Sequence, residues 1–277
     1  MYHLHSLGWE KLATIAAENV HLTFVMNLLT QLLHLVGSGA SAYILANGMR
    51  DAKSRPNLLA GFQMAESGAV PFLTALRDRA DQEGETWLAE RLDRHANDEK
   101  RHGQIFAHAL KQLNKKVIDF NRDRKPEPEK DLNSRPDESK RSPFFGGYFA
   151  GYSQEELKPE NISWEVFLAS TYILELDASK DFVRMANALP DDPINANIRK
   201  SILSVAQDET GHAAYLFEAM ERRYGSVKTQ QLVGEWRDRK VNAMVAGVRN
   251  FIEKGGKMAE MVEEGAPVEM PESSVAA

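Results

Sequence analysis

The sequence predicts an all-α protein, and three observations support this class. Apolar residues recur at helical spacing through most of the 277 residues. Alternating apolar and polar runs bounded by turn residues, which indicate strands, are nearly absent. The hydrophobic fraction of 43% supplies enough apolar material for a sizeable core. We expect a single helical domain over 1–255 and a disordered tail over 256–277, whose composition is typical of disorder.

Six helices are expected, in the order 8–36, 57–82, 84–116, 161–188, 194–223 and 226–254. The first is so apolar that it must cover other helices or pair with a second subunit, which favours a homodimer. Asn57, Ser163 and Ser226 supply ordinary start signals for later helices. A polar segment with five prolines, about 117–160, indicates a long crossover, partly packed by an aromatic cluster at 144–149.

Composition excludes several classes of site and partner. The chain has no cysteine, so any metal must be bound by His, Asp or Glu. The net charge of −6 argues against nucleic acid as the main partner. The apolar stretch from Val20 to Val36 is too short to span a bilayer, and the first residues lack the pattern of a secretory signal. We therefore expect a cytoplasmic protein without a membrane partner.

Two Glu-x-x-His motifs carry the chemistry. Glu99 with His102 and Glu209 with His212 each place a carboxylate and an imidazole on one helix face. An earlier glutamate, at 66 and at 175, interrupts an apolar helix face before each motif, where a charge is costly unless it is paired or metal-bound. Glu66 and Glu99 are 33 residues apart, and Glu175 and Glu209 are 34 apart. Each interval matches a helix, a short turn and an antiparallel helix that returns to the same height. Four carboxylates and two imidazoles at one level predict a dinuclear site suited to iron or manganese.

On these motifs, the chain resembles the ferritin-like diiron-carboxylate superfamily over about 57–223. The resemblance implies a four-helix bundle with the long crossover between its second and third helices, plus an extra helix at each end. It implies two iron ions, with Mn/Fe as an alternative, and it makes Glu99 and Glu209 the bridges between them. Asp98 and Asp208 would accept hydrogen bonds from the ligand histidines, and Arg101 completes an Asp-Glu-x-Arg-His run. Gly211 departs from that run in the second motif. The ligands implied are Glu66, Glu99, His102, Glu175, Glu209 and His212.

Within the superfamily, the oxygenase or oxidase branch is the most similar. This branch uses O₂ as co-substrate, oxidises a small organic substrate and takes electrons from an external ferredoxin or reductase. Ser179, four residues after Glu175, stands where related monooxygenases keep a threonine, so it is a candidate catalytic residue. Phe106 occupies the position of the radical tyrosine of ribonucleotide-reductase small subunits, which disfavours that function. His95 is expected at the surface or behind the ligands, and Tyr215 as a packed aromatic with its hydroxyl satisfied.

Three alternatives remain open from the sequence. A rubrerythrin-like peroxidase or an iron-handling protein needs no organic pocket. A tRNA-hydroxylase-like enzyme would use the basic run formed by Lys111, Lys115, Lys116, Arg122, Arg124 and Lys125, although a solvated crossover explains that run better. A non-catalytic helical interaction protein would bind no metal.

Overall fold

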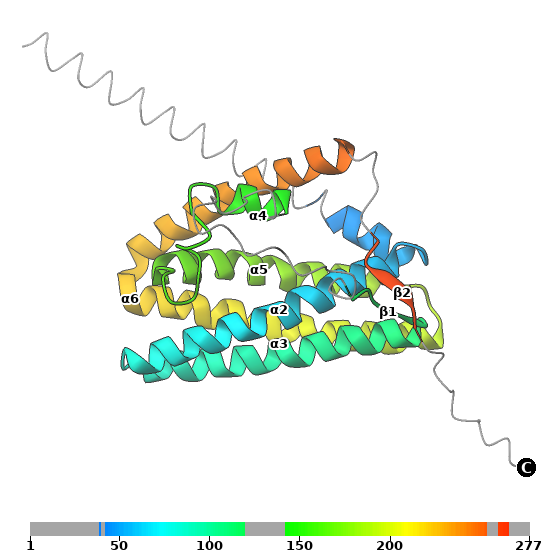
Figure 1. The fold of residues 1–277 in the computed structure, drawn as a ribbon, viewed down its shortest axis with the longest axis horizontal. Helices are drawn as coiled ribbons and strands as arrows, with labels where there is room; N and C mark the ends of the chain where they lie inside the picture. The colour runs from blue at the N-terminus through cyan, green and yellow to red at the C-terminus, as the bar shows by residue number, and fades with distance from the viewer. Residues whose placement is uncertain (1–38, 40–41, 120–141, 254–259, 266–277) are drawn as a thin grey trace, which may run out of the picture.

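A computed structural model describes residues 39, 42–119, 142–253 and 260–265 of the chain. Four long helices make up most of this part and lie side by side (Figure 1). α2 packs mainly on α3 and α5 mainly on α6, while α3 also contacts α6. The predicted all-α class is confirmed. The bounds of these helices are Arg55–Gln82 for α2, Thr86–Gln112 for α3, Trp164–Ala188 for α5 and Pro193–Glu253 for α6.

The long helix α6 changes direction at Gly225, whose φ of 72° and ψ of 165° are not helical. This region of backbone conformation is essentially restricted to glycine. The part of α6 after Gly225 runs back across the molecule beside α4 (Figure 1). The sequence predicted separate helices over 194–223 and 226–254, and the break between them is where it was expected.

The predicted helix over 84–116 is too long at its end, and part of the predicted disordered tail is ordered. α3 ends at Gln112, and β1 (Lys115–Val117) pairs in an antiparallel manner with β2 (Val262–Glu264). Two lysines of β1 face two glutamates of β2; the Lys116 Nζ to Glu263 Oε1 distance is 3.2 Å. Composition alone predicted disorder after residue 255 because it does not reveal a pairing partner almost 150 residues away in the chain.

The aromatic cluster of the crossover packs as predicted. α4 (Pro143–Tyr148) begins after Ser142, whose hydroxyl accepts a hydrogen bond from the backbone N–H of Phe145. Tyr148 is fully buried, donates a hydrogen bond from its hydroxyl to the carbonyl of Ser170 at 2.8 Å, and packs edge-on against Trp236. α4 is therefore held firmly against α5 and α6. Residues 120–141 of the crossover lie outside the described part.

Inside the four helices, a polar layer separates two apolar clusters. One cluster contains Leu76 and Leu92, and the other contains Leu59 and Phe106. On α2 and α3, Glu66 and the first Glu-x-x-His motif fall between members of the two clusters, and the same holds on α5 and α6. Charged side chains in this layer are therefore closed off by apolar packing at both ends.

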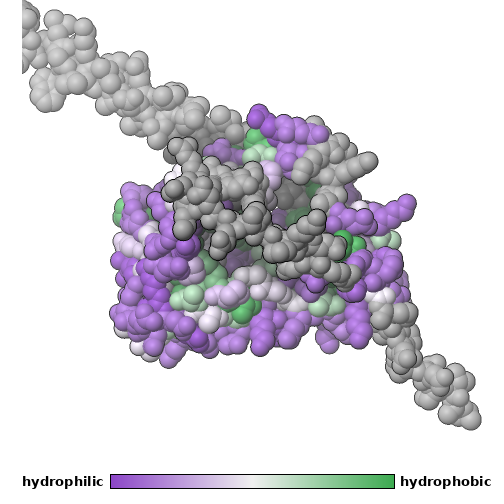
Figure 2. Space-filling view, in the orientation of Figure 1, coloured by the Kyte–Doolittle hydropathy of each residue, from purple (hydrophilic) through white to green (hydrophobic). Residues whose placement is uncertain are grey.

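Other expectations meet the structure only in part. The predicted first helix, 8–36, and the dimer contact expected of it lie outside the described residues. Residues 42–50 are helical, although no helix was predicted there. None of the described helices is both long and apolar enough to cross a membrane. On the face shown in Figure 2, hydrophilic residues border a middle zone that carries hydrophobic ones.

Candidate metal centre

The carboxylates and imidazoles of the sequence motifs meet at one level between the four long helices. α2 and α5 each contribute one glutamate, and α3 and α6 each contribute a Glu-x-x-His motif. The donor atoms form two groups, and within each group all of them lie within 4.8 Å of one another. All six residues predicted from the sequence are brought together, and Glu99 belongs to both groups. The groups are Glu66, Glu99, His102 and Glu209, and His95, Glu99, Glu175 and His212.

Glu99 and Glu209 lie between the two motif histidines. Glu209 directs Oε1 to within 3.2 Å of His102 Nδ1 and Oε2 to within 3.3 Å of His212 Nδ1. Glu99 Oε1 lies 3.9 Å from His102 Nδ1 and 3.6 Å from His212 Nδ1. Each of these carboxylates therefore reaches both imidazoles, which is the position a bridging carboxylate needs in a dinuclear site.

The remaining two glutamates occupy opposite ends of the cluster. Glu66 Oε2 lies 3.6 Å from His102 Nδ1, and Glu175 Oε2 lies 3.7 Å from His212 Nδ1. His102 Nδ1 and Glu209 Oε1 are buried without a hydrogen-bond partner among the described residues, although they face each other. Buried polar atoms normally have partners, so this orphaned pair indicates a place for a cation. The donor set of carboxylates and imidazoles suits iron or manganese.

Two aspartates orient the motif histidines from behind. His102 Nε2 lies 3.2 Å from Asp208 Oδ2, and His212 Nε2 lies 3.3 Å from Asp98 Oδ2. Each aspartate thus serves the histidine of the other motif. An aspartate that accepts a hydrogen bond from Nε2–H leaves the Nδ1 lone pair directed at the carboxylates. Arg101 ion-pairs with Asp208 and lies 3.6 Å from Asp98, so it links the two aspartates.

Replacing Asp98 or Asp208 with asparagine is expected to weaken metal binding by about 10–100-fold, because the amide no longer orients the imidazole as a charged acceptor. Competition between the protein and a coloured chelator for Co²⁺ measures this affinity. Asp93→Asn is the matched control, since Asp93 is on α3 but pairs with Arg77 outside the cluster. Equal affinities for all three variants and the unmodified protein would contradict the role of the aspartates.

His95 belongs to the cluster. The sequence predicted that it lies at the surface or behind the ligands, and the surface position is wrong. The side chain is buried, with Nε2 3.0 Å from Glu99 Oε1 and 3.4 Å from Glu175 Oε1. Nδ1 lies 2.8 Å from the hydroxyl of Tyr215, and the ring stacks on that of His212 with centroids 3.8 Å apart. The prediction that the Tyr215 hydroxyl is satisfied is confirmed. The four-residue spacing from His95 to Glu99, which puts both on one helix face, was the signal in the sequence.

Burial and mutual repulsion change the protonation of this cluster. Burial, together with the nearby carboxylates of Glu66 and Glu175, raises the pKa of Glu99 far above its usual range. Burial and Glu175 also raise the pKa of Glu209. Burial lowers the pKa of His102, but the carboxylates of Glu209 and Glu66 beside its Nδ1 outweigh this effect and raise that pKa to about 9.

His212 and His95 respond in opposite directions. Burial lowers the pKa of His212, but hydrogen bonds to Asp98, Glu175 and Glu209 outweigh it and raise that pKa to about 11. Burial and the neighbouring imidazole of His212 lower the pKa of His95, which is therefore neutral. Without a metal, the cluster thus retains protons on carboxylates and imidazoles that a metal ion would displace.

Metal affinity is expected to rise with pH, because the raised pKa values mean that a metal must displace protons from Glu99, Glu209, His102 and His212. Each displaced proton raises the metal affinity about tenfold per pH unit. His102 alone has one proton to displace up to about pH 9. Calorimetric titration with Zn²⁺ in buffers of different ionisation enthalpy counts the protons released. His108→Gln, at an exposed histidine of α3, should leave that count unchanged. Affinity independent of pH would contradict this expectation.

Ser179, the candidate catalytic residue, is not brought to the cluster. Its hydroxyl donates a hydrogen bond to the carbonyl of Leu176 at 2.9 Å, within its own helix. It is also not among the residues that line the cavity next to the cluster, although Ala178 and Thr171 are. Thr171, one turn before Glu175, is a hydroxyl-bearing residue that the sequence reasoning missed.

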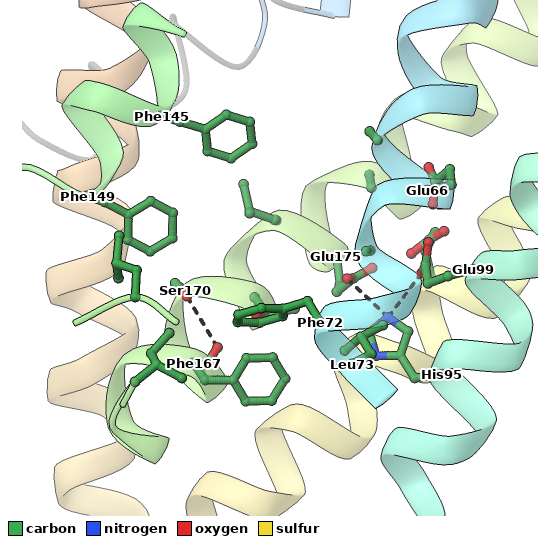
Figure 3. Close-up of a pocket in the computed structure, with 18 residues that line it drawn as sticks. Glu66, Phe72, Leu73, His95, Glu99, Phe145, Phe149, Phe167, Ser170 and Glu175 are labelled. Atoms are coloured by element: carbon green, nitrogen blue, oxygen red, sulfur yellow. Dashed lines mark hydrogen bonds and ion pairs between the residues drawn. The ribbon is translucent and has the colours of Figure 1, made fainter. Parts of the chain in front are cut away.

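A cavity of about 430 Å³ extends from the cluster toward α4. Figure 3 shows Glu66, Glu99, Glu175 and His95 at one side of it and the rings of Phe145 and Phe149 at the other. Its lining is mostly apolar. The arrangement therefore joins a candidate dinuclear metal centre to a space for a small molecule.

No protein-family model, curated protein or solved structure matched this chain in the comparisons made.

Proposed function

We propose that this chain is a ferritin-like protein that binds two iron ions and acts as an oxygenase or oxidase on an organic substrate. The observation that carries the proposal is the pair of donor groups that share Glu99 at one end of an apolar cavity. Glu99 and Glu209 would bridge the ions, with Glu66 and His102 on one ion and Glu175 and His212 on the other. The proposal is supported by the order of α2, α3, α5 and α6 and by the residue types of the donors, since di-iron carboxylate sites in four-helix bundles use one glutamate from each of two helices and a Glu-x-x-His motif from each of the other two.

His95 adds a third imidazole to the proposed ligand set. Its Nε2 faces Glu99 and Glu175, so it would join the ion held by Glu175 and His212. The two ions would then have unequal ligand sets, with two imidazoles on one and a single imidazole on the other. Tyr215 holds the other ring nitrogen of His95 and so positions it.

When bound, two ferrous ions supply electrons for the reduction of O₂, so that one oxygen atom can enter a substrate while the other leaves as water. The residues of the chain do the rest. The carboxylates and imidazoles would hold the ions, Asp98 and Asp208 would orient the imidazoles, and the apolar lining of the cavity would keep water from a bound substrate. A separate ferredoxin or reductase, or the substrate itself, would restore the ferrous state.

The cavity favours this function over iron storage or peroxide removal, neither of which needs an organic pocket. A tRNA-hydroxylase-like function is less well supported, because Lys115 and Lys116, from the basic run, ion-pair with Glu264 and Glu263 of β2. A protein that binds no metal would have to bury the orphaned pair of His102 and Glu209 without a benefit.

Anaerobic loading with ferrous iron tests the proposal. After unbound metal is removed, elemental analysis should find two iron ions per chain, and added O₂ should be consumed with a transient visible absorption. Mn²⁺ and Fe²⁺ supplied together test the mixed centre. A loaded protein without bound metal would overturn the proposal, and iron uptake that continues past two ions per chain would support storage instead.

A further inference from the structure

The cavity next to the candidate metal centre has the size of a small-molecule site. Its volume of about 430 Å³ falls within the roughly 300–1,000 Å³ typical of such sites. It lies between α2 and α5, and Phe145 of α4 and Phe149, the residue after α4, line its outer side (Figure 3). A molecule bound there would meet carboxylates at one end and mostly aliphatic and aromatic side chains along the rest of its length.

The space beside the cluster exists because side chains near the carboxylates are small. Ala65 and Ala69 flank Glu66 on α2, and Ala178 lies one turn after Glu175 on α5; all three line the cavity. A larger side chain at residue 69 would fill the space beside Glu66. These alanines are therefore the positions that set how closely a bound molecule approaches the cluster.

The charges of the lining restrict what can bind. No lysine or arginine is present among the described residues that line the cavity, whereas four glutamates are. The hydroxyl of Ser170 is engaged with the carbonyl of Phe167 at 3.2 Å. In the metal-free protein, a sulfonate, phosphate or carboxylate in the cavity would find no lysine or arginine among these residues to pair with and would lie in mostly apolar surroundings, which is costly.

The outer wall of the cavity is fixed in place and aromatic. α4 is anchored by Tyr148, which is hydrogen-bonded to α5 and packed on Trp236. Phe145 and Phe149 stack with their centroids 6.4 Å apart. Phe145 is 46% exposed, which matches a position at the mouth of the cavity.

We infer that the molecule this site takes is an uncharged, largely apolar compound of small-molecule size, bound in this cavity with one end at the carboxylates. That this molecule is the substrate rests on the proposed oxygenase or oxidase function. The binding itself depends only on the cavity, so it can be tested without iron or O₂.

Two fluorescent probes with nearly the same ring skeleton test the inference: neutral phenylnaphthylamine and anionic anilinonaphthalene sulfonate. The neutral probe should bind the metal-free full-length protein at least about tenfold more tightly, because the sulfonate finds no lysine or arginine in the cavity to pair with. Equal affinity, or tighter binding of the anionic probe, would overturn the inference. This comparison uses the unmodified protein and does not depend on the folding of any variant.

A pair of variants locates the binding. Ala69→Phe should weaken binding of the neutral probe at least about tenfold by filling the cavity, whereas Gly68→Phe adds the same ring at a position where a Cβ meets nothing within 4 Å. Gly68→Phe should leave probe binding unchanged. Equal effects of the two substitutions would overturn the assignment to this cavity. If Ala69→Phe does not fold, as judged by circular dichroism, Leu174→Trp on the facing wall replaces it.

Metal content separates this inference from the proposed function. Ala69→Phe is expected to keep two iron ions per chain while losing the probe. Probe binding in a protein that takes up no iron would leave the cavity as a ligand site and overturn the oxygenase or oxidase. Iron uptake and O₂ consumption without selective binding of the neutral probe would overturn the substrate class alone.

Discussion

Replacing Glu99 with alanine is expected to remove both metal ions from the protein. Glu99 is the only described residue that belongs to both donor groups, and its Oε1 lies within 4 Å of His95, His102 and His212. Loss of an orienting partner already lowers metal affinity about 10–100-fold, so loss of a shared ligand should cost more than about 100-fold for each ion. Elemental analysis after anaerobic ferrous loading should find no retained iron, and O₂ consumption should disappear.

The control for Glu99→Ala is Glu90→Ala, which removes an exposed glutamate from the same helix and should retain both ions. Misfolding is not the expected cause of metal loss. Burial and the neighbouring carboxylates raise the pKa of Glu99, so at neutral pH the metal-free protein must hold this side chain protonated against its ordinary pKa, a cost that alanine removes. Glu99→Ala without metal should therefore be at least as resistant to urea as the metal-free parent. Retention of two ions by this variant would refute the assignment of Glu99 as a bridge.

The cluster shows how far helical spacing alone carries a prediction. The intervals from Glu66 to Glu99 and from Glu175 to Glu209 matched two antiparallel helix pairs, and the structure places all four carboxylates together. Spacing succeeds here because a charge on an apolar helix face must find partners at the same height, and only a few residues offer them.

His95 and Ser179 show where spacing fails. His95 lies on the same face as Glu99, but its place inside depends on Tyr215, a partner 120 residues away on another helix. Ser179 lies one turn after Glu175, but its hydroxyl bonds to its own helix, and no spacing rule predicts that choice of rotamer. The strand β2 was missed for a related reason, since its pairing with β1 is also distant in sequence.

Metal binding is expected to raise the thermal stability of the protein strongly. A ligand present at about 1,000 times its Kd stabilises the folded state by about 4 kcal/mol, which corresponds to a rise in Tm of roughly 8–16 °C for a chain of this size. Zn²⁺ or Mn²⁺ serves as the ion, because neither requires O₂ to be excluded. Differential scanning calorimetry with the ion, and then with an excess of chelator, measures the change.

The same rise in Tm should grow with pH, and the sign follows from the raised pKa values. The folded pKa of Glu99 and Glu209 lies above the unfolded value of 4.5, so their contribution to stability is fully present below pH 4.5 and is lost as pH rises. His102 and His212 likewise contribute below about pH 6.5 and lose that contribution as pH rises through about 9 and about 11. The metal-free protein thus weakens at alkaline pH while the metal binds more tightly. Glu99→Ala is the control and should show no such rise in Tm. If the unmodified protein has the same Tm with metal and with chelator, the buried carboxylates and imidazoles are held without an ion.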